Sequence, residues 1–287
     1  MAFRRRRPQY NDSYGPRRGG RSLKGTIIIG LLLAGFALFK YFSNQQTNPI
    51  TGEVQHVSIS TEQEIAIGLQ SAPRMVQQHG GLHPDQRAQE HVKMVGERLV
   101  RNSIVRRSDY QYNFYLLRDD RVVNAFALPG GQVFITAALY GQLENEDQLA
   151  GVLGHEIGHV IHRHGAERIA KMELTQGLTG AAVIASGDYN TSQAAQMIGN
   201  IVNMKYGRDQ ELESDDFGVR IMLEAGYDAS ELVGVMDILE RASGGQSKSE
   251  FMSTHPSPDN RRERIREAIE RYESGRIEYR LPFEEER

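Results

Sequence analysis

The spacing of apolar residues predicts a chain that is mostly helical. In the segments 61–79, 85–101 and 145–164, apolar residues recur at intervals of three and four, as they do on the buried face of a helix. The residues from Ser60 onward offer a capping box for the first of these helices, and Asn145 can cap the third. These helices are expected to form most of the core.

Two further stretches are expected to be helical. Asp259–Arg271 has the charge density of a solvated helix, and Leu174–Lys205 predicts two helices around the turn 187–190. The second stretch is rich in Ala, Gly, Gln and Ser, and its apolar patches are too short to cross a membrane. Ordinary packing is one interpretation of this stretch, and a cover or lid over a site is the other.

Strands are expected between residues 110 and 136. Aromatic and apolar residues dominate in Tyr110–Leu117, and the turn-forming residues 118–120 that follow predict a hairpin. Residues 122–136 predict a second and a third strand, interrupted by the turn Pro129-Gly130-Gly131. The expected fold is therefore α+β, predominantly helical, with a small β-sheet.

The longest apolar stretch is Gly25–Phe42, in which Lys40 is the single charge. Its 18 residues are about the minimum that spans a bilayer as a helix. A cleaved signal peptide is the competing interpretation, although no small-residue cleavage site follows, and a buried core helix is the third. We favour an uncleaved transmembrane anchor.

The segment before this stretch is strongly basic. Residues 1–24 carry eight Arg or Lys side chains against one Asp, and their Arg, Gly, Pro and Tyr content predicts disorder. Such a tail could bind nucleic acid, but basic residues beside a membrane span are explained better by retention in the cytoplasm. We expect a single-pass protein of a bacterial inner membrane with a periplasmic domain and no nucleic-acid partner.

Composition limits the chemistry that is possible. The sequence contains no cysteine, so disulfides and thiolate metal sites are excluded, and any bound metal must use His, carboxylate or water. The chain is expected to consist of five parts: a basic tail (1–24), an anchor (25–42), a polar linker (43–58), one domain (59–273) and an acidic C-terminal tail (274–287).

The helix predicted over 145–164 contains the motif HExxH. His155 and His159 are four residues apart and project from one helix face, so they can bind one ion, with Glu156 placed to take a proton from metal-bound water. The alternative is two solvated histidines and an ordinary surface glutamate. The apolar neighbours Ile157 and Val160 argue against that alternative, because they indicate a helix with little solvated surface.

A catalytic zinc site needs a third protein ligand and leaves the fourth position for water. One known class uses a third His six residues after the second, but residue 165 is Gly, which excludes that class. A glutamate on a later helix is the other solution, and Glu211 supplies it. Asp215 lies on the same face and could accept a hydrogen bond from a ligand histidine, whereas Glu213 points elsewhere. A solvated acidic helix start remains the alternative for either carboxylate taken alone.

Four motifs in a fixed order resemble the M48 family of zinc metallopeptidases. They are NAFALPGG from residue 124, HEIGHVIHRH from residue 155, ELESDDFG from residue 211 and STHPSPDNR from residue 253, and the resemblance covers about residues 50–270. It implies a gluzincin fold for the domain, one Zn²⁺ held by His155, His159 and Glu211, Glu156 as general base and Asp215 behind the ligands.

The resemblance also implies where substrate binds. An extended peptide would lie along an edge strand formed by Asn124, Ala125, Phe126, Ala127 and Leu128, next to Gly130 and Gly131. His255 and Arg261 are carried over as catalytic residues and are our candidates to stabilise the tetrahedral oxyanion. In some family members this segment also keeps the resting site closed.

These features together predict a membrane-anchored zinc endopeptidase that acts on unfolded or misassembled proteins in envelope quality control. A membrane-tethered chaperone or assembly factor with a structural zinc is the alternative from another class. Glu156 argues for hydrolysis, because a purely structural site has no use for a base beside an open position. A third interpretation, an anchored nucleic-acid binder, depends on the arginine-rich tail alone.

Overall fold

The helices expected from the apolar spacing are present in the computed structural model, which describes residues 23–186, 206–243, 248–255 and 260–275. The larger helices are α1 (Leu23–Ser43), α2 (Thr61–Gln78), α3 (Gln86–Arg101), α5 (Glu146–Ile161), α6 (His164–Ser186), α8 (Arg208–Glu224), α9 (Glu231–Ser243) and α11 (Arg261–Glu273). Short helices are η1 (Ile104–Arg107), α4 (Ala137–Tyr140) and α10 (Phe251–Thr254). The predicted caps form: Ser60 makes a capping box with Gln63, and Asn145 accepts a hydrogen bond from Gln148.

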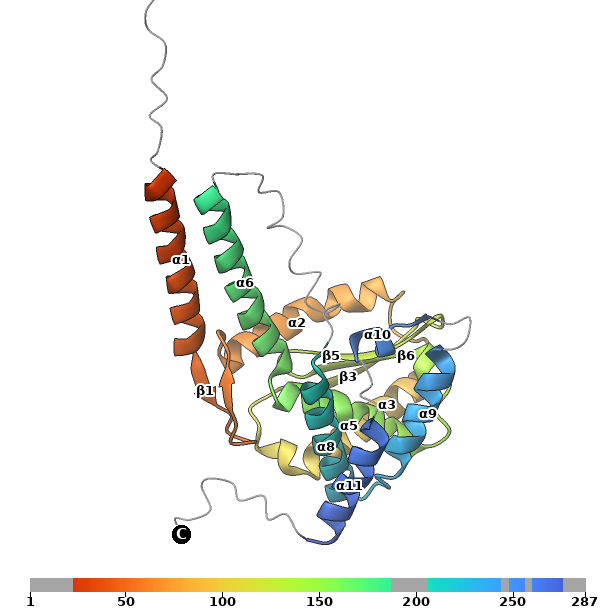
Figure 1. Ribbon diagram of the computed structural model, residues 1–287. Coiled ribbons are helices and arrows are strands. Elements are labelled where there is room, and N and C mark those ends of the chain that lie inside the picture. The colour runs from red at the N-terminus through yellow and green to blue at the C-terminus, as the bar shows by residue number, and fades with distance from the viewer. Residues whose placement is uncertain (1–22, 187–205, 244–247, 256–259, 276–287) are drawn as a thin grey trace, which may run out of the picture.

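A three-stranded sheet lies over one side of α5 (Figure 1). Its order is β3 (Asn113–Leu117), β6 (Gln132–Thr136) and β5 (Ala125–Leu128). Strands β5 and β6 form the antiparallel hairpin expected around Pro129-Gly130-Gly131, and the prediction of an α+β, predominantly helical fold is confirmed.

The prediction of a hairpin after β3 is wrong. Strand β3 pairs in parallel with β6, and the turn after it leads to β4 (Val122–Val123), which pairs in parallel with β7 (Lys248–Ser249). All five residues of β6 are buried, so this strand takes the centre of the sheet and leaves β3 and β5 at its two sides. The apolar pattern predicts the strands but not their partners.

Helix α5 is the centre of the fold, and every residue from Gln148 to Ile161 is buried. It packs closely on α8 because small residues meet at the crossing: a Cβ added at Gly158 would lie 2.8 Å from the backbone oxygen of Ser214, and one added at Gly218 would lie 3.2 Å from the backbone nitrogen of His155. This close approach brings the side chains of α8 to the histidines of α5.

The expected helix through His164 is interrupted. Helix α5 ends at Ile161, and α6 begins at His164 after a turn in which Arg163 has a φ of 53°. The Arg163 guanidinium holds this conformation through a buried ion pair with Glu64 at 2.5 Å and a hydrogen bond to the carbonyl oxygen of Ile59. The partner residues lie about a hundred positions earlier, so local spacing could not predict the break.

The segment expected as a polar linker contains an antiparallel hairpin of β1 (Gln45–Thr47) and β2 (Val54–His56). The buried Asn48 side chain donates a hydrogen bond of 2.7 Å to the carbonyl oxygen of Ile161, and Gln55 donates to the carbonyl oxygen of His162. These contacts satisfy the last carbonyl groups of α5, which have no partner within the helix.

Helices α1 and α6 project side by side from the rest of the molecule (Figure 1). The segment Lys24–Ser43 is long and apolar enough to cross a membrane. The first of the two helices expected in Leu174–Lys205 is the end of the continuous helix α6, and the second lies outside the described residues.

Candidate metal centre and active site

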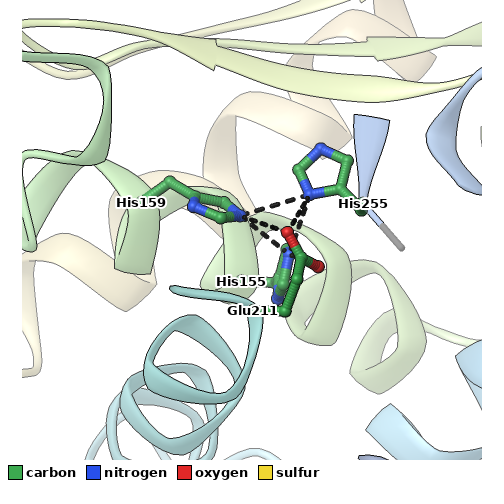
Figure 2. A group of neighbouring side chains, drawn as sticks. All are labelled: His155, His159, Glu211 and His255. Atoms are coloured by element: carbon green, nitrogen blue, oxygen red, sulfur yellow. Dashed lines mark hydrogen bonds and ion pairs between the residues drawn. The ribbon is translucent and has the colours of Figure 1, made fainter. Parts of the chain in front are cut away.

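Four buried side chains from three segments converge on one point. His155 and His159 come from α5, Glu211 from the first turn of α8, and His255 follows α10 (Figure 2). The Nε2 atoms of His155 and His159 are 3.1 Å apart and lie 3.3 and 3.2 Å from Nδ1 of His255. Oε1 of Glu211 lies 3.5 Å from Nε2 of His159 and 3.1 Å from Nδ1 of His255, and its Oε2 lies 3.5 Å from Nε2 of His155.

These separations fit a tetrahedral metal ion. Zinc bonds of about 2.0–2.1 Å at tetrahedral angles require ligand atoms about 3.3 Å apart, which lies within the observed range of 3.1–3.5 Å. The four side chains are also at most 2% exposed, so their nitrogen and oxygen atoms meet away from solvent. The donor set is therefore suited to a small dication.

Asp215 and Arg261 support one side of this group. Asp215 lies four residues after Glu211 and accepts a 2.8 Å hydrogen bond from Nδ1 of His155, which turns the Nε2 atom toward the centre. Arg261 makes two contacts with the Asp215 carboxylate, at 2.5 and 2.8 Å, and its Nη1 is 3.3 Å from Glu211. Burial alone would raise the pKa of Asp215, but the charges and hydrogen bonds of Arg261 and His155 together outweigh it and lower the pKa to about 2.

His164 and Glu213 support the other side. Nδ1 of His159 lies 2.8 Å from Nδ1 of His164, whose Nε2 lies 3.0 Å from Glu213. If Nε2 of His159 binds a metal, its proton is on Nδ1 and is donated to His164, which in turn donates from Nε2 to Glu213. Burial lowers the pKa of both histidines well below the usual value, in agreement with two neutral rings.

Glu156 faces the cluster from inside α5. Its side chain is fully buried, its two oxygens have no hydrogen-bond partner within the described part of the chain, and Oε1 lies 3.7 Å from Nε2 of His255. Burial raises the pKa of this carboxyl, although the charges of His255 and His155 oppose the shift. A buried carboxylate without a partner, next to a group of metal-type ligands, is arranged to exchange a proton.

Tyr206 and His255 cover the cluster. The Tyr206 ring stacks on His159 with centroids 3.7 Å apart, and the Arg168 guanidinium lies 3.2 Å from the Tyr206 ring centroid. The backbone N–H of Tyr206 donates to the carbonyl oxygen of Thr254, so the two covering segments are joined next to His255. In this conformation the four ligand atoms are shielded from solvent.

The predicted substrate strand is next to the cluster. Strand β5 is an edge strand, since within the described residues it pairs with β6 alone, and a small pocket at its end is lined by Ala127, Leu128, His159 and Tyr206. The glycines of the following turn have positive φ, and a Cβ added at Gly130 would lie 2.4 Å from the Cα of Ile65. The space next to Gly130 is thus taken by α2, and a role of the two glycines in substrate binding stays a prediction.

Comparison with known proteins identifies the family. The sequence pattern described as peptidase family M48 matches residues 86–269, which is more than half of the chain. The chain belongs to peptidase family M48. The resemblance seen in the four sequence motifs is confirmed.

Several named proteases are similar to this M48 chain. The β-barrel assembly-enhancing protease of Yersinia pestis is 30% identical over 83% of this chain, and the mitochondrial metalloendopeptidase OMA1 of Schizosaccharomyces pombe is 28% identical over 84%. Metalloprotease YcaL of Escherichia coli is 33% identical over 55% of the chain. The match covers 50% of the Yersinia protein, 71% of the yeast protein and 61% of YcaL.

Three residues at this M48 site were absent from the sequence prediction: His164, Arg168 and Tyr206. His164 had a usable signal, because a ligand histidine needs an acceptor for its second nitrogen and His164 is five residues from His159. Arg168 and Tyr206 reach the site through packing between distant segments, for which the sequence offers no spacing rule.

Proposed function

We propose that this M48 chain is a zinc-dependent endopeptidase, anchored in a membrane, that hydrolyses unfolded or misassembled proteins. The observation that supports this best is the convergence of His155, His159, Glu211 and His255 beside the buried carboxylate of Glu156, which accepts no hydrogen bond from the residues that the structure describes. Two relatives, a β-barrel assembly-enhancing protease and a mitochondrial metalloendopeptidase, support an envelope or membrane protease.

His155, His159 and Glu211 are the proposed ligands of one Zn²⁺. When bound, the ion makes water more acidic, toward a pKa of about 7, and polarises the carbonyl group of the scissile bond. The Glu211 carboxylate is ready for this role, because the charges of His255, His155 and Arg261 outweigh the effect of burial and lower its pKa.

Glu156 is the proposed general base. It takes a proton from the attacking water and returns that proton to the nitrogen of the leaving amine. Its raised pKa suits both halves of this transfer, because a carboxyl group that is too acidic would hold the proton too weakly to deliver it.

His255 closes the resting site in this proposal. Its Nδ1 takes the fourth corner of the ligand group, the position that a catalytic zinc site leaves for water. Hydrolysis then requires His255 to move, together with the segment that also carries α10. This differs from the oxyanion role expected from the sequence.

Arg261 is also given a different role. Its guanidinium contacts Asp215, Glu211 and His155, so we propose that it orients the ligands and balances their charge in place of stabilising the oxyanion. Burial of the guanidinium would lower its pKa, but its contacts with the carboxylates of Asp215 and Glu211 on α8 outweigh burial and raise the pKa.

Substrate is proposed to add to the edge of β5 that pairs with no other strand among the described residues. An extended peptide would pair with Ala125, Phe126, Ala127 and Leu128 through main-chain hydrogen bonds, with Asn124 at the start of the strand. Pairing of this kind needs an extended chain, so it favours unfolded segments over folded domains.

Helix α1 is the proposed membrane anchor. Only 6% of its apolar segment is buried against the rest of the protein, although its residues are strongly apolar. With the basic tail in the cytoplasm, the peptidase domain lies on the opposite side of the membrane, which is the periplasm in a bacterium.

Digestion of unfolded casein by the full-length chain in detergent tests this proposal. The wild type and a His255→Ala variant, which keeps the fourth position open, are compared with the same chains carrying Glu156→Gln, with and without a zinc chelator. We expect cleavage that the chelator abolishes and that Glu156→Gln reduces by about 100- to 10,000-fold without loss of metal. Cleavage that survives both treatments, or no cleavage by either parent chain, would contradict the proposal.

A further inference from the structure

The second half of α6 runs along α1, away from the peptidase domain (Figure 1). Lys40 of α1 forms an ion pair of 2.9 Å with Glu173 of α6. Further along both helices, a Cβ added at Gly177 would lie 2.7 Å from the Cβ of Ala37. The two helices are therefore antiparallel and closely packed, with a glycine at the point of contact.

The part of α6 beyond this ion pair carries no charge. Glu173 is the last charged residue of the helix, and residues 174–186 are all uncharged. The hydroxyls of Thr175 and Thr179 donate hydrogen bonds of 2.8 Å to the carbonyl oxygens four residues earlier, so they need no water. Apart from Gln176, whose side chain lines the cavity between the two helices, this segment has the properties of a helix that is surrounded by lipid.

The apolar segments of the two helices begin at the same level. Lys40 and Glu173 are opposite each other, and from there α1 runs back toward its first residue while α6 runs forward to Ser186. Thirteen residues of α6 span about 20 Å, compared with about 30 Å for the hydrocarbon core of a bilayer. The end of α6 is thus about level with Ile28, near the start of the apolar stretch of α1.

The outer surfaces of α1 are apolar over this same length. Ile28, Leu31, Leu32, Phe36 and Phe39 are 57–70% exposed. A cavity of about 330 Å³ between the helices is lined by Leu33, Phe36 and Ala37 of α1 and by Leu174, Gly177 and Ala181 of α6. Both the outer surface and this cavity suit acyl chains.

We propose that α6, from Leu174 to Ser186, is embedded in the bilayer beside α1. The inference rests on the proposed anchoring by α1: if α1 lies in the membrane up to Lys40, the part of α6 at the same level is surrounded by the same lipid. A second copy of the chain or another protein is not favoured, because α1 already supplies the helix that packs on Gly177.

This placement brings the metal centre close to the membrane. His164, the first residue of α6, contacts His159, and the nine residues from there to Glu173 span about 14 Å. The site would then meet chain segments at the membrane surface, such as those of membrane proteins whose assembly has failed. The substrates of the proposed peptidase would then be chain segments that lie at the membrane surface.

Single-cysteine labelling tests the placement directly, because the natural chain contains no cysteine. The variants Leu31→Cys on α1, Thr179→Cys on α6 and Lys93→Cys on α3 all replace side chains that are exposed on the protein itself. The full-length chain in phospholipid vesicles is treated with a charged maleimide from both faces of the membrane, and then again after addition of detergent.

We expect Lys93→Cys to react at once and the other two variants to react only in detergent. A fluorophore at position 179 should also be quenched by nitroxide groups attached to lipid tails, as one at position 31 is. If Thr179→Cys is labelled rapidly while Leu31→Cys is protected, the placement of α6 in the bilayer is overturned but the anchoring by α1 is not. Rapid labelling of Leu31→Cys would also overturn the proposed membrane anchoring by α1. Protection of Thr179→Cys from the maleimide without quenching by the lipid nitroxides would show that another protein, and not lipid, covers this face of α6.

Discussion

Two groups of histidine and carboxylate side chains around α5 and α8 look alike in the sequence but differ in the structure. In the first group, His155, His159 and Glu211, with His255, turn their ligand atoms toward one point and lie within 3.1–3.5 Å of one another. In the second group, His162 and His164 each face a separate carboxylate, Glu53 at 3.1 Å and Glu213 at 3.0 Å.

The difference lies in where the ring nitrogens point. In the first group, Nδ1 of His155 and Nδ1 of His159 point outward to a partner, which leaves their Nε2 atoms free for a cation, and Nδ1 of His255 points to the same place. In the second group, His164 uses both nitrogens, one for His159 and one for Glu213. The carboxylates of Glu53 and Glu213 are 46% and 41% exposed, whereas Glu211 is fully buried. Proximity of ligand-type residues is therefore not enough, and convergence decides which group can hold a metal.

The largest effect is expected from matched substitutions in the two groups. Glu211→Ala removes one of three proposed protein ligands and should abolish both metal binding and proteolysis, because two histidines do not close the site. Glu213→Ala, two residues away on the same helix, should keep the metal. Elemental analysis of both purified variants checks this, and equal metal content in the two would break the distinction between the groups.

The next effect concerns His255, the member of the first group that comes from outside α5 and α8. His255→Ala should retain metal on the three remaining ligands and raise the rate of casein cleavage, because the fourth position becomes free for water. If His255 were instead the oxyanion donor expected from the sequence, the rate would fall by about 100- to 1,000-fold. The sign of the change separates the two roles.

A smaller effect is expected from the residues where the two groups touch. His164→Asn should weaken metal affinity by about 10- to 100-fold, since His159 loses the acceptor that orients its ring. His162→Asn is the matched control and should leave the affinity unchanged. Competition with a chromophoric chelator measures both constants, and an equal loss in both variants would refute the relay through His164.

The smallest effect is the dependence of metal-free stability on pH, to which Asp215, behind the first group, and Glu213, in the second group, contribute with opposite signs. The folded pKa of Asp215 lies below its ordinary 3.8, at about 2, so its contribution of about 2 kcal/mol is present above pH 3.8 and is lost as the pH falls to 2. The folded pKa of Glu213 is raised from 4.5 to about 7 by burial, so its contribution is present below pH 4.5 and is lost as the pH rises to 7.

Urea unfolding of the chelated protein across this pH range measures these contributions. Asp215→Asn should flatten the decline of the free energy of unfolding at acid pH. Glu213→Gln should flatten the decline between pH 4.5 and 7 and leave the acid limb as it is. A wild-type protein whose stability does not change in either interval would show that the two carboxyl groups are not shifted in these directions.

Residues that act within one helix were predictable from the sequence. The four-residue spacings from His155 to His159 and from Glu211 to Asp215 are fixed by the geometry of the helix, and the structure places both pairs at one centre. The main helices and the strands were predictable for the same reason, because their apolar period is local.

Features that depend on distant contacts were not predictable. The break between α5 and α6 depends on the ion pair of Arg163 with Glu64, and the parallel pairing of β3 with β6 depends on which strand the core buries most deeply. His255 enters the ligand group from a segment 44 residues after Glu211. The spacing of residues along the chain does not predict such long-range contacts, which are decided by packing and by the pairing of buried charges.

Anomalous diffraction at the zinc edge from crystals of the full-length wild-type chain shows directly which group of side chains holds the metal. We expect one strong peak, within bonding distance of Nε2 of His155, Nε2 of His159 and the Glu211 carboxylate, and no peak between His162, His164 and Glu213. A peak at the second group, or a zinc-loaded protein with no peak at the first, would contradict this expectation.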